Sequence, residues 1–544
     1  QFLHNIRLYN NAFAFTSMGA SVRPNNPVRQ DRTVLDGGGP FTYRIQGALC
    51  HRIGTLGRLP GHVPAYAQLY FYDTSTTTVD ARIALNNDMD RKTVITLQRI
   101  FMQCTPMTRV FQHAHEQMLG GNEDMQLRIH SRLLGLDRRR YNRPTAYEIG
   151  GIFIGSGQDQ SRDIVLQLSA SGHLMRVFES HQIHDALQYP LLHTHAEVGL
   201  NENNNTIDEA NHEGNEALAP RGQVTPREYA AYRMCTRDRD DSLIHRSGRL
   251  VQQYCFDQAC TIEEQRLKYQ REHQSQLRTD VYAGVMDSIA EHGGRTLNRT
   301  GTRIILAPSY PGSDRYMRAQ YQDAMAIVRA MGKPDLFITG TCNPKWTEVT
   351  EALLLGQNVS DRPDLTARVF REKLKAILTD LSAGLLGLEL ARIHVINFQK
   401  RGLPHAHLLM ILADTDKPRL ASDYDRIVSA EIPDPSNERL HATIRTCMMH
   451  EPCGRANPTP PCMRDGACSK RFPKSFCNAT TRQRNNGRTV TVRGAELDNR
   501  YVVPYNPWLC HKYDCHINVE ICSTVTSVKY LYKYIYKGDD RVVV

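Results

Sequence analysis

The sequence has no long hydrophobic run, and this absence excludes the simplest class of membrane protein. No part of its 544 residues approaches the ~18 to 20 unbroken apolar residues that a membrane-spanning helix needs. No secretory signal peptide opens the chain. We therefore expect a soluble protein without a membrane partner.

Two further absences limit the fold and the function. No unit recurs with a period of ~20 to 50 residues, which argues against a repeat architecture. The phosphate-binding loop G-x-x-x-x-G-K-[ST] is missing, so we predict no ATPase in this fragment. The chain begins with Gln1 rather than Met and ends in VVV, and we expect it to be a piece of a longer product.

The length and the charge balance are the first positive signals. A chain of this size is expected to form three or four domains. Its 67 Lys and Arg against 57 Asp and Glu give a net charge of +10, the sign expected of a polyanion binder. Five arginines crowd beside Tyr141: Arg132, Arg138, Arg139, Arg140 and Arg143. This cluster fits a solvated loop as well as a phosphate contact or an import signal to the nucleus.

The stretch from residue 300 to 425 alternates helical and strand patterns, which predicts an α+β fold. Residues 315–331 and 362–381 read as helices, the second with one stripe of apolar side chains: Phe370, Leu374, Ile377, Leu378 and Leu381. Residues 334–341 read as a strand. Residues 391–399 and 405–412 read as two more strands joined by the five-residue turn KRGLP, which predicts a β-hairpin.

Two histidines lie one residue apart at the start of the last strand. Side chains at i and i+2 of a strand share a face, so His405 and His407 project together and can bind a divalent metal. The hairpin is expected to place Gln399 opposite His405 and Asn397 opposite the second histidine as further ligands. Such a site keeps coordination positions open, as catalytic Mg²⁺ or Mn²⁺ requires. The alternative is one packing histidine and one solvent-facing histidine.

The sequence contains a second His-x-His pair, His193 and His195. No apolar strand follows it, and it precedes a linker rich in Asn and Glu. We expect this pair to be structural or incidental.

The end of the chain, SVKYLYKYIYKG, carries candidate nucleophiles. On a helix, Tyr530 and Tyr534 are neighbours at i and i+4, and each follows a lysine, Lys529 and Lys533. The cations favour phenolate and attract a phosphate. Alternatives are an aromatic surface helix, an alternating strand, or the pair of tyrosines at 532 and 536, which has the same spacing.

Four motifs in this order resemble the replication-initiator domain of Helitron transposases, whose HUH endonucleases carry two tyrosines. They are DLFITGTCNPKWTEV, FQKRGLPHAH, CHINVE and KYLYKYIYKG, and the openings HNIRLYNNAFAFTSMGA and FTYRIQGALCHRIGTLGRLPG are also similar to those proteins. The resemblance covers most of the chain. It implies nicking and rejoining of single-stranded DNA at transposon ends through 5′-phosphotyrosine intermediates.

Within this resemblance the two histidines would hold the metal, and the two tyrosines would attack in succession. Lys400 and Arg401 in the turn would contact DNA, and Trp346 would stack on a base or, equally, belong to the core. The family has Glu where this chain has Asn397, so a catalytically inactive DNA-binding remnant is the alternative function. A third candidate function is that of an ordinary metal-bound regulatory domain. Full-length relatives continue into a C-terminal helicase.

The 14 cysteines are unevenly spread, and five lie between Cys447 and Cys477. Such local density argues for metal rather than disulfides. Four soft ligands in two clusters fit a closed zinc site, and the resembling family shows a similar block: His450, Cys453, Cys462 and Cys468. Cys447 or Cys477 could substitute, and free thiols are the alternative. A weaker second candidate is CHKYDCH, with Cys510, His511, Cys515 and His516.

These observations predict an antiparallel-sheet HUH core with a zinc-bearing insertion. The expected regions are a β-containing DNA-binding part (1–198), a flexible linker (199–224), a helical brace (225–299), the core (300–425), the zinc insertion (440–480) and a C-terminal part with the tyrosine helix (481–544). Within the brace, the pattern is helical from Leu250 to about Ile289, and Thr261 and Glu264 form a capping-box pair at the head of TIEEQRLKYQREHQSQLRTDVYAGVMDSI.

Overall fold

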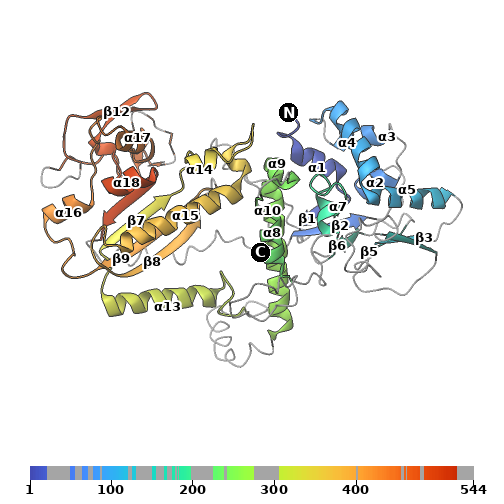
Figure 1. Cartoon of the computed structure of the whole chain (residues 1–544), viewed down its shortest axis with the longest axis horizontal. Coiled ribbons are helices and arrows are strands. Elements are labelled where there is room, and N and C mark those ends of the chain that lie inside the picture. Colours follow the sequence, from blue (N-terminus) through green and yellow to red (C-terminus); the bar gives the residue numbers. More distant parts are fainter. Residues whose placement is uncertain are drawn as a thin grey trace, which may run out of the picture.

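A computed structural model gives the fold, and it describes the following residues: 1–20, 49–54, 64–71, 77–85, 88–119, 125–129, 150–154, 164–167, 174–177, 181, 183–197, 224–237, 242–274, 306–399, 402–454, 457, 459–460, 462–477 and 483–522. Two lobes lie on opposite sides of the long helix α10 (Arg249–Glu272) (Figure 1). The N-terminal lobe comes from the described residues up to 197, and the sheet lobe from those between 306 and 522. Among the helices of these residues, none has the length and apolar character to cross a membrane.

In the described residues of the N-terminal lobe, helices contain more residues than the short strands do. Its elements are α1 (Ile6–Phe13), β1 (Ser17–Ala20), β2 (Leu49–Gly54), α2 (Ala67–Phe71), α3 (Thr77–Leu85), α4 (Arg91–Cys104), α5 (Pro106–Leu119), β3 (Met125–Ile129), β4 (Gly150–Ile154), β5 (Ile164–Gln167), β6 (Leu174–Val177) and α7 (His184–Gln188). Aromatic rings dominate its core. The buried guanidinium of Arg82 lies over Phe13 and Tyr70, 4.2 and 4.6 Å from their ring centroids, and donates to the carbonyl of Ala12.

Helix α10 is joined to the N-terminal lobe by a buried carboxylate. Asp185 of α7 accepts hydrogen bonds from the Tyr254 hydroxyl at 3.0 Å and from the Gln258 amide at 2.9 Å. Burial alone would raise the pKa of Asp185, but hydrogen bonds from His184 and Tyr254 and the nearby His193 hold it at about 2. The carboxylate is therefore charged at neutral pH and fully engaged with its neighbours.

Helix α10 agrees with the helical pattern expected from Leu250 onward, but the capping box predicted at Thr261 is wrong. Thr261 lies inside α10 and is buried, because the preceding residues from Arg249 onward already form helix and bury a stripe on the same face. A capping box does occur at the short helix α8 (Pro226–Arg233), where Thr225 and Glu228 exchange side-chain and backbone bonds. Helix α9 (Leu243–Arg246) links α8 to α10.

The sheet lobe is built on four antiparallel strands in the order β14-β7-β9-β8. They are β7 (Leu336–Thr341), β8 (Glu389–Phe398), β9 (Pro404–Leu412) and β14 (His516–Ile521). The first three match the predicted strands, and the mixture of helices with antiparallel sheet confirms the α+β class. Strand β14 closes the sheet on the far side of β7, with His516 opposite Thr341.

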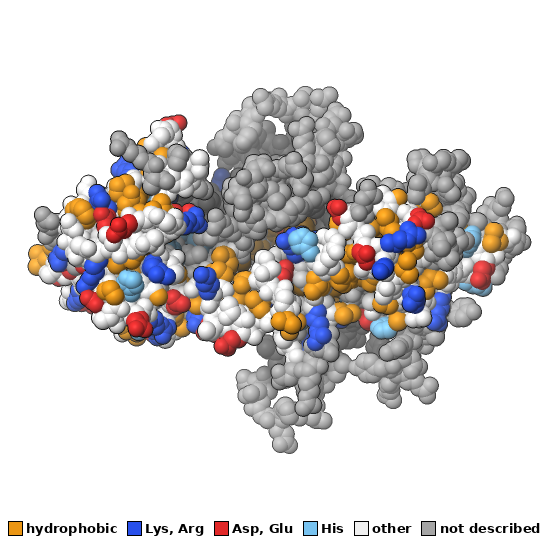
Figure 2. All heavy atoms as spheres, turned by 90° about the horizontal axis from the view of Figure 1, so that it is seen from above, with side chains coloured by type: hydrophobic (Ala, Val, Ile, Leu, Met, Phe, Trp, Pro, Cys, Tyr) orange, Lys and Arg blue, Asp and Glu red, His pale blue; other side chains and the backbone are white. Residues whose placement is uncertain are grey.

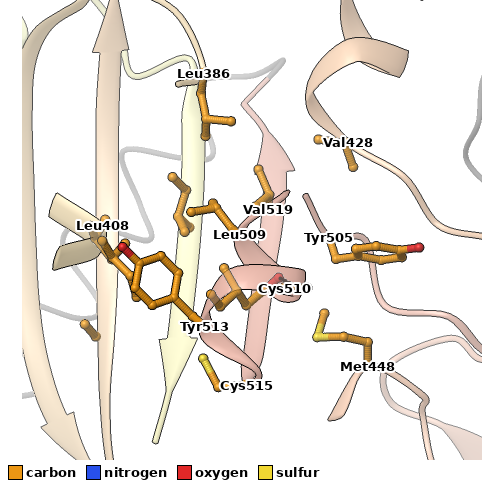
Figure 3. Close-up of a cluster of buried hydrophobic side chains, with 14 of the residues drawn as sticks. Leu386, Leu408, Val428, Met448, Tyr505, Leu509, Cys510, Tyr513, Cys515 and Val519 are labelled. Carbon is orange, nitrogen blue, oxygen red and sulfur yellow. Dashed lines mark hydrogen bonds between the residues drawn. The ribbon is translucent and has the colours of Figure 1, made fainter. Parts of the chain in front are cut away.

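One face of this sheet carries the main hydrophobic core. Helix α15 (Pro363–Ser382) covers it with Phe370, Leu374, Ile377 and Leu381, as the apolar stripe predicted. Helices α17 (Glu438–Cys447) and α18 (Pro507–Tyr513) complete the layer. Figure 3 shows Leu408 of β9, Val519 of β14 and Leu509 of α18 in this core.

A smaller cluster lies on the opposite face. Helix α13 (Asp314–Met331) packs there through Ala324, which contacts Leu409 of β9 in a cluster that also includes Phe337 and Val395. The remaining elements of the lobe are α14 (Thr347–Thr350), η2 (Val359–Asp361), α16 (Ala421–Ile427), β10 (Met463–Arg464), β11 (Ala467–Cys468), β12 (Thr489–Val492), β13 (Ala495–Asp498) and η3 (Asn499–Tyr501).

Trp346 belongs to the core, so its assignment as a base-stacking residue is wrong. Its side chain is 4% exposed, and its indole N–H donates to the carbonyls of Tyr513 and Asp514 at 2.8 and 3.1 Å. The second of the two tryptophans, Trp508 on α18, is 44% exposed, and the Lys512 ammonium lies 4.7 Å from its ring centroid. The sequence does not distinguish the two, because burial is decided by the packing of α18 on the sheet.

This difference gives a stability prediction with an internal control. Trp346→Ala removes a buried ring and strands two carbonyls, and it should lower the free energy of unfolding by about 3 to 5 kcal/mol. Trp508→Ala should change it by less than about 0.5 kcal/mol. Urea unfolding followed by circular dichroism measures both, and equal losses would contradict the packing described for α18.

Candidate functional site

The two histidines of β9 form the first candidate site. Because the strand alternates, Ala406 and Leu408 point into the main core while His405 and His407 project from the other face. Their ring centroids are 4.7 Å apart and the rings are perpendicular. The pair therefore lies together on one face, as the sequence predicted.

Neighbouring residues of β7 orient His407. The hydroxyl of Thr339, directly opposite in the ladder, lies 3.0 Å from Nδ1 of His407, and the ring of Phe337 stacks 5.6 Å away. A hydrogen bond at Nδ1 fixes the ring plane, so a metal would be bound through Nε2. Neither Thr339 nor Phe337 was singled out from the sequence. The strand alternation around the DLFITGT motif is the signal that could have found them.

The predicted register of the hairpin is wrong by two residues. Asn397 lies opposite His405, and Val395 lies opposite His407. The backbone N–H of Gln399 donates to the carbonyl of Leu403 at 2.9 Å. The loop is shorter than the predicted KRGLP turn, because Gly402, with φ +79°, closes it and Leu403 already pairs. Gln399 is thereby removed from the histidine row, and Asn397 becomes the neighbour of His405.

A row of polar side chains crosses the sheet at this level. It runs from Asn397 through His405 and Thr341 to His516, one residue from each strand. His516 is already engaged, since its Nδ1 lies 2.8 Å from the Cys447 carbonyl, and burial lowers its pKa. The row thus offers the imidazole of His405 and the amide oxygen of Asn397, and His407 lies two residues further along β9 on the same face. Together these residues supply two imidazoles and an amide oxygen but no carboxylate. This donor set can hold a divalent ion and is weaker than one that includes a carboxylate.

The second His-x-His pair does not form a comparable site. His193 is buried, with Nδ1 3.5 Å from Glu197 and 3.4 Å from Arg233, whereas His195 is exposed. The two residues lie in an irregular segment after α7, so they do not share a strand face.

Several predicted site residues lie outside the described residues. They are Lys400 and Arg401 of the turn, Tyr530 and Tyr534, and their preceding lysines Lys529 and Lys533. Their assignments stay predictions.

A second site is formed by the four residues predicted to bind zinc. The ligand atoms of His450, Cys453, Cys462 and Cys468 all lie within 4.8 Å of one another. Cys468 Sγ is 3.8 Å from Nε2 of His450. Tetrahedral zinc with bonds of about 2.0 to 2.3 Å places its ligand atoms about 3.3 to 3.8 Å apart. The cluster could therefore hold a metal ion such as Zn²⁺.

The surroundings of His450 suit a metal ligand. Its Nδ1–H donates to the Glu451 carbonyl at 2.8 Å, which leaves the lone pair on Nε2, and Phe472 stacks on the ring at 4.1 Å. Burial, with nearby Lys474 and Lys470, lowers the pKa of His450, so the imidazole is neutral as metal binding requires.

The thiols of the cluster differ in the direction in which their pKa values are shifted. Burial and the adjacent Cys468 and Cys462 thiols raise the pKa of Cys453 to about 12. Burial also opposes ionisation of Cys468, but backbone N–H groups of Phe472 and Lys470 hold its pKa below the usual value. Three thiols this close cannot all ionise without a compensating cation.

The other sulfur candidates are not brought together in this way. Across the described residues, the four-residue cluster alone gathers three or more His, Cys, Asp or Glu ligand atoms at this spacing. In CHKYDCH, Cys510 and Cys515 are buried in the main core while His511 is exposed, so the second metal site is not formed. Cys447 ends α17 and Cys477 also lies outside the cluster, so neither is a substitute ligand.

Comparison with known families supports the resemblance stated from the sequence. Residues 229–410 match the family model of the Helitron helicase-like domain at the N-terminus. No curated protein matches the chain. The matched segment runs from α8 into β9, so it includes His405, His407 and Asn397, and over this segment the chain is similar to that domain. Such a domain fits DNA binding.

Metal removal should test the second site. A closed Cys/His site adds its binding free energy to folding, on the order of 10 kcal/mol for zinc. Chelation should lower the melting temperature, and Cys453→Ser or Cys462→Ser should reproduce this in buffer without chelator. Cys235→Ser changes an exposed thiol just after α8, and it should leave both the melting temperature and the metal content unchanged. Purified protein without stoichiometric metal would contradict the assignment.

Proposed function

We propose that the chain is the endonuclease part of a Helitron-like rolling-circle transposase, acting in the nucleus, that nicks and rejoins single-stranded DNA. The observation that carries the proposal is the His405 and His407 pair on the central strand β9, inside the segment that matches the Helitron model. The Asn397 amide beside His405 completes a donor set for Mg²⁺ or Mn²⁺. Bound there, the ion would polarise the scissile phosphate.

The chain's own residues would carry the covalent steps. The phenolate oxygen of Tyr530 or Tyr534 attacks phosphorus, and the bond from phosphorus to the 3′ oxygen breaks. The leaving 3′ oxygen takes a proton from water and becomes a free 3′-hydroxyl. The product is a 5′-phosphotyrosine, which preserves the energy for rejoining. Lys529 and Lys533 precede the tyrosines in sequence and favour the ionised phenol. Two tyrosines allow two strands to be held in succession.

The zinc cluster is proposed to be structural. Four protein ligands close a tetrahedral site and leave no position for substrate, in contrast to the open histidine site. The two sites also differ in ligand softness, so each selects its own ion.

An inactive DNA-binding remnant remains the second candidate. The observation that favours it is Asn397, which occupies the position opposite His405 where the resemblance implies Glu. An amide in place of a carboxylate removes one negative charge from the ion's surroundings and weakens the site.

The observed register predicts which substitution strengthens the histidine site. Asn397→Glu puts a carboxylate beside His405 and should tighten Mn²⁺ binding on the order of tenfold. Gln399→Glu adds the same charge one residue beyond the end of β8, opposite Leu403, and should have little effect. Isothermal titration with Mn²⁺ on zinc-loaded protein compares them, and a larger gain from Gln399→Glu would contradict the register.

Nicking assays test the proposed chemistry. With a labelled single-stranded oligonucleotide and Mn²⁺, the wild-type chain should form a protein adduct at the 5′ phosphate, and peptide mapping should locate it on Tyr530 or Tyr534. His405→Ala with His407→Ala should abolish cleavage while the fold is retained, because the metal ligands are lost. The matched change at His193 and His195 should leave cleavage in place, and equal loss would overturn the choice of pair.

The two tyrosines should be separable by single and double substitutions. Phe at one position should leave partial nicking and impair strand transfer, which needs a second nucleophile. Phe at both should remove the adduct and leave DNA binding. An adduct on Tyr532 or Tyr536 would contradict the choice of tyrosines, and a wild-type chain that binds DNA without any adduct favours the remnant.

A further inference from the structure

The hairpin around the metal cluster carries cations that have no acidic partners. Within the described residues, none of the following four side chains forms an ion pair: Arg464, Lys470, Arg471 and Lys474. Three of them are exposed and Lys474 is half-buried. Between Cys462 and Cys477 the only carboxylate is Asp465, at the tip of the hairpin. We name this stretch the zinc hairpin.

Five other cations of the same lobe each form an ion pair with a nearby carboxylate. The pairs, with their N–O distances, are Arg484 with Asp425 (3.0 Å), Arg488 with Asp434 (2.6 Å), Arg493 with Glu451 (2.7 Å), Arg500 with Asp498 (2.8 Å) and Lys512 with Asp380 (2.7 Å). Figure 2 shows this mixture of Lys, Arg, Asp and Glu over the visible face of the lobe. Unlike these five, the four cations of the zinc hairpin form no ion pair within the described residues, and the hairpin contains a single carboxylate, Asp465.

The backbone that carries these cations is fixed at several points. Strands β10 and β11 pair across a tight turn in which Asp465 and Gly466 have φ of +50° and +78°. The Ser469 N–H donates to the Cys462 carbonyl at 2.7 Å, and the Lys474 N–H donates to the Arg500 carbonyl at 3.0 Å. Cys462 and Cys468 flank the turn between β10 and β11, so a metal in the cluster would hold both sides of this turn.

An exposed aromatic ring adjoins the cations. Phe476 is 39% exposed, and the Arg500 guanidinium lies 5.0 Å from its ring centroid. Phosphate-binding cations next to an accessible ring form the combination with which proteins hold single strands, since the backbone is bound by charge and a base stacks on the ring. Duplex DNA, whose bases are already stacked, cannot use the ring.

We propose that the zinc hairpin is a second DNA-contacting surface, separate from the histidine site, which binds the phosphate backbone of single-stranded DNA and stacks one base on Phe476. The choice of DNA as the polyanion rests on the proposed function. The four cations supply the charge, and the metal cluster keeps them in place.

The test compares two double variants that remove the same charge. Lys470→Gln with Arg471→Gln alters unpaired cations, and Arg484→Gln with Arg488→Gln alters paired ones. Both are made in the His405→Ala, His407→Ala background, so cleavage plays no part, and zinc content is measured for each. Binding of a fluorescein-labelled 30-nucleotide single strand is followed by anisotropy across a range of salt concentrations.

The hairpin variant should bind on the order of tenfold more weakly, and the slope of log K against log salt should fall by about 0.7 for each cation that contacts a phosphate. The paired variant should keep the wild-type slope. Phe476→Ala should weaken binding roughly fivefold or more at an unchanged slope, because it removes stacking and no charge. Equal losses in the two double variants, or a loss confined to duplex DNA, would overturn the proposal.

Failure of this proposal and failure of the proposed function give different results. If the chain nicks DNA and the hairpin substitutions leave its affinity for single-stranded DNA unchanged, only the second surface is contradicted. A chain that binds through the hairpin and never forms an adduct contradicts only the nuclease function.

Discussion

The two-faced geometry of strand β9 is the constraint on which the sheet lobe depends. Each successive side chain must alternate between faces, so Ala406 and Leu408 can enter the core only if His405 and His407 leave it. A slip of one residue against β7 would turn both imidazoles into the main core and move Ala406 and Leu408 to the face covered by α13. The large energetic penalty for that exchange fixes the register. The same hydrophobic packing that stabilises the lobe thus aligns the two imidazoles with Thr339, Thr341 and Asn397.

Periodicity in the sequence was enough to predict the elements that bury apolar residues. Strands β7, β8 and β9 and helix α15 carry unambiguous patterns, and the His/Cys cluster follows from ligand spacing alone. Three features did not follow. The hairpin register depends on loop closure at Gly402, the burial of Trp346 depends on the distant helix α18, and Thr261 has a capping pattern that α10 overrides. Each is decided by contacts between segments far apart in sequence or by one backbone angle, which local composition does not encode.

The two candidate metal sites differ in how much the surrounding fold would depend on a bound ion. His405 and His407 lie on a sheet that is stabilised by its own hydrophobic core, so an ion bound between them would not be needed for folding. The cysteine cluster lies in a stretch with short two-residue strands and few buried apolar side chains, where four ligands take the place of a core. This division explains why soft ligands gather in the insertion and hard or borderline ligands remain on the sheet.

The pairing of β14 with β7 has a consequence for how the chain acquires its structure. These two strands are neighbours in the sheet although about 180 residues separate them, so joining them closes a very long loop, which is slow and entropically unfavourable. The cysteine cluster lies inside that loop. A metal captured there during synthesis would compact part of the intervening chain before β14 leaves the ribosome and so shorten the effective loop. The ion would then act as an early folding nucleus for the distant sheet, and metal supply during translation would set the yield of complete protein.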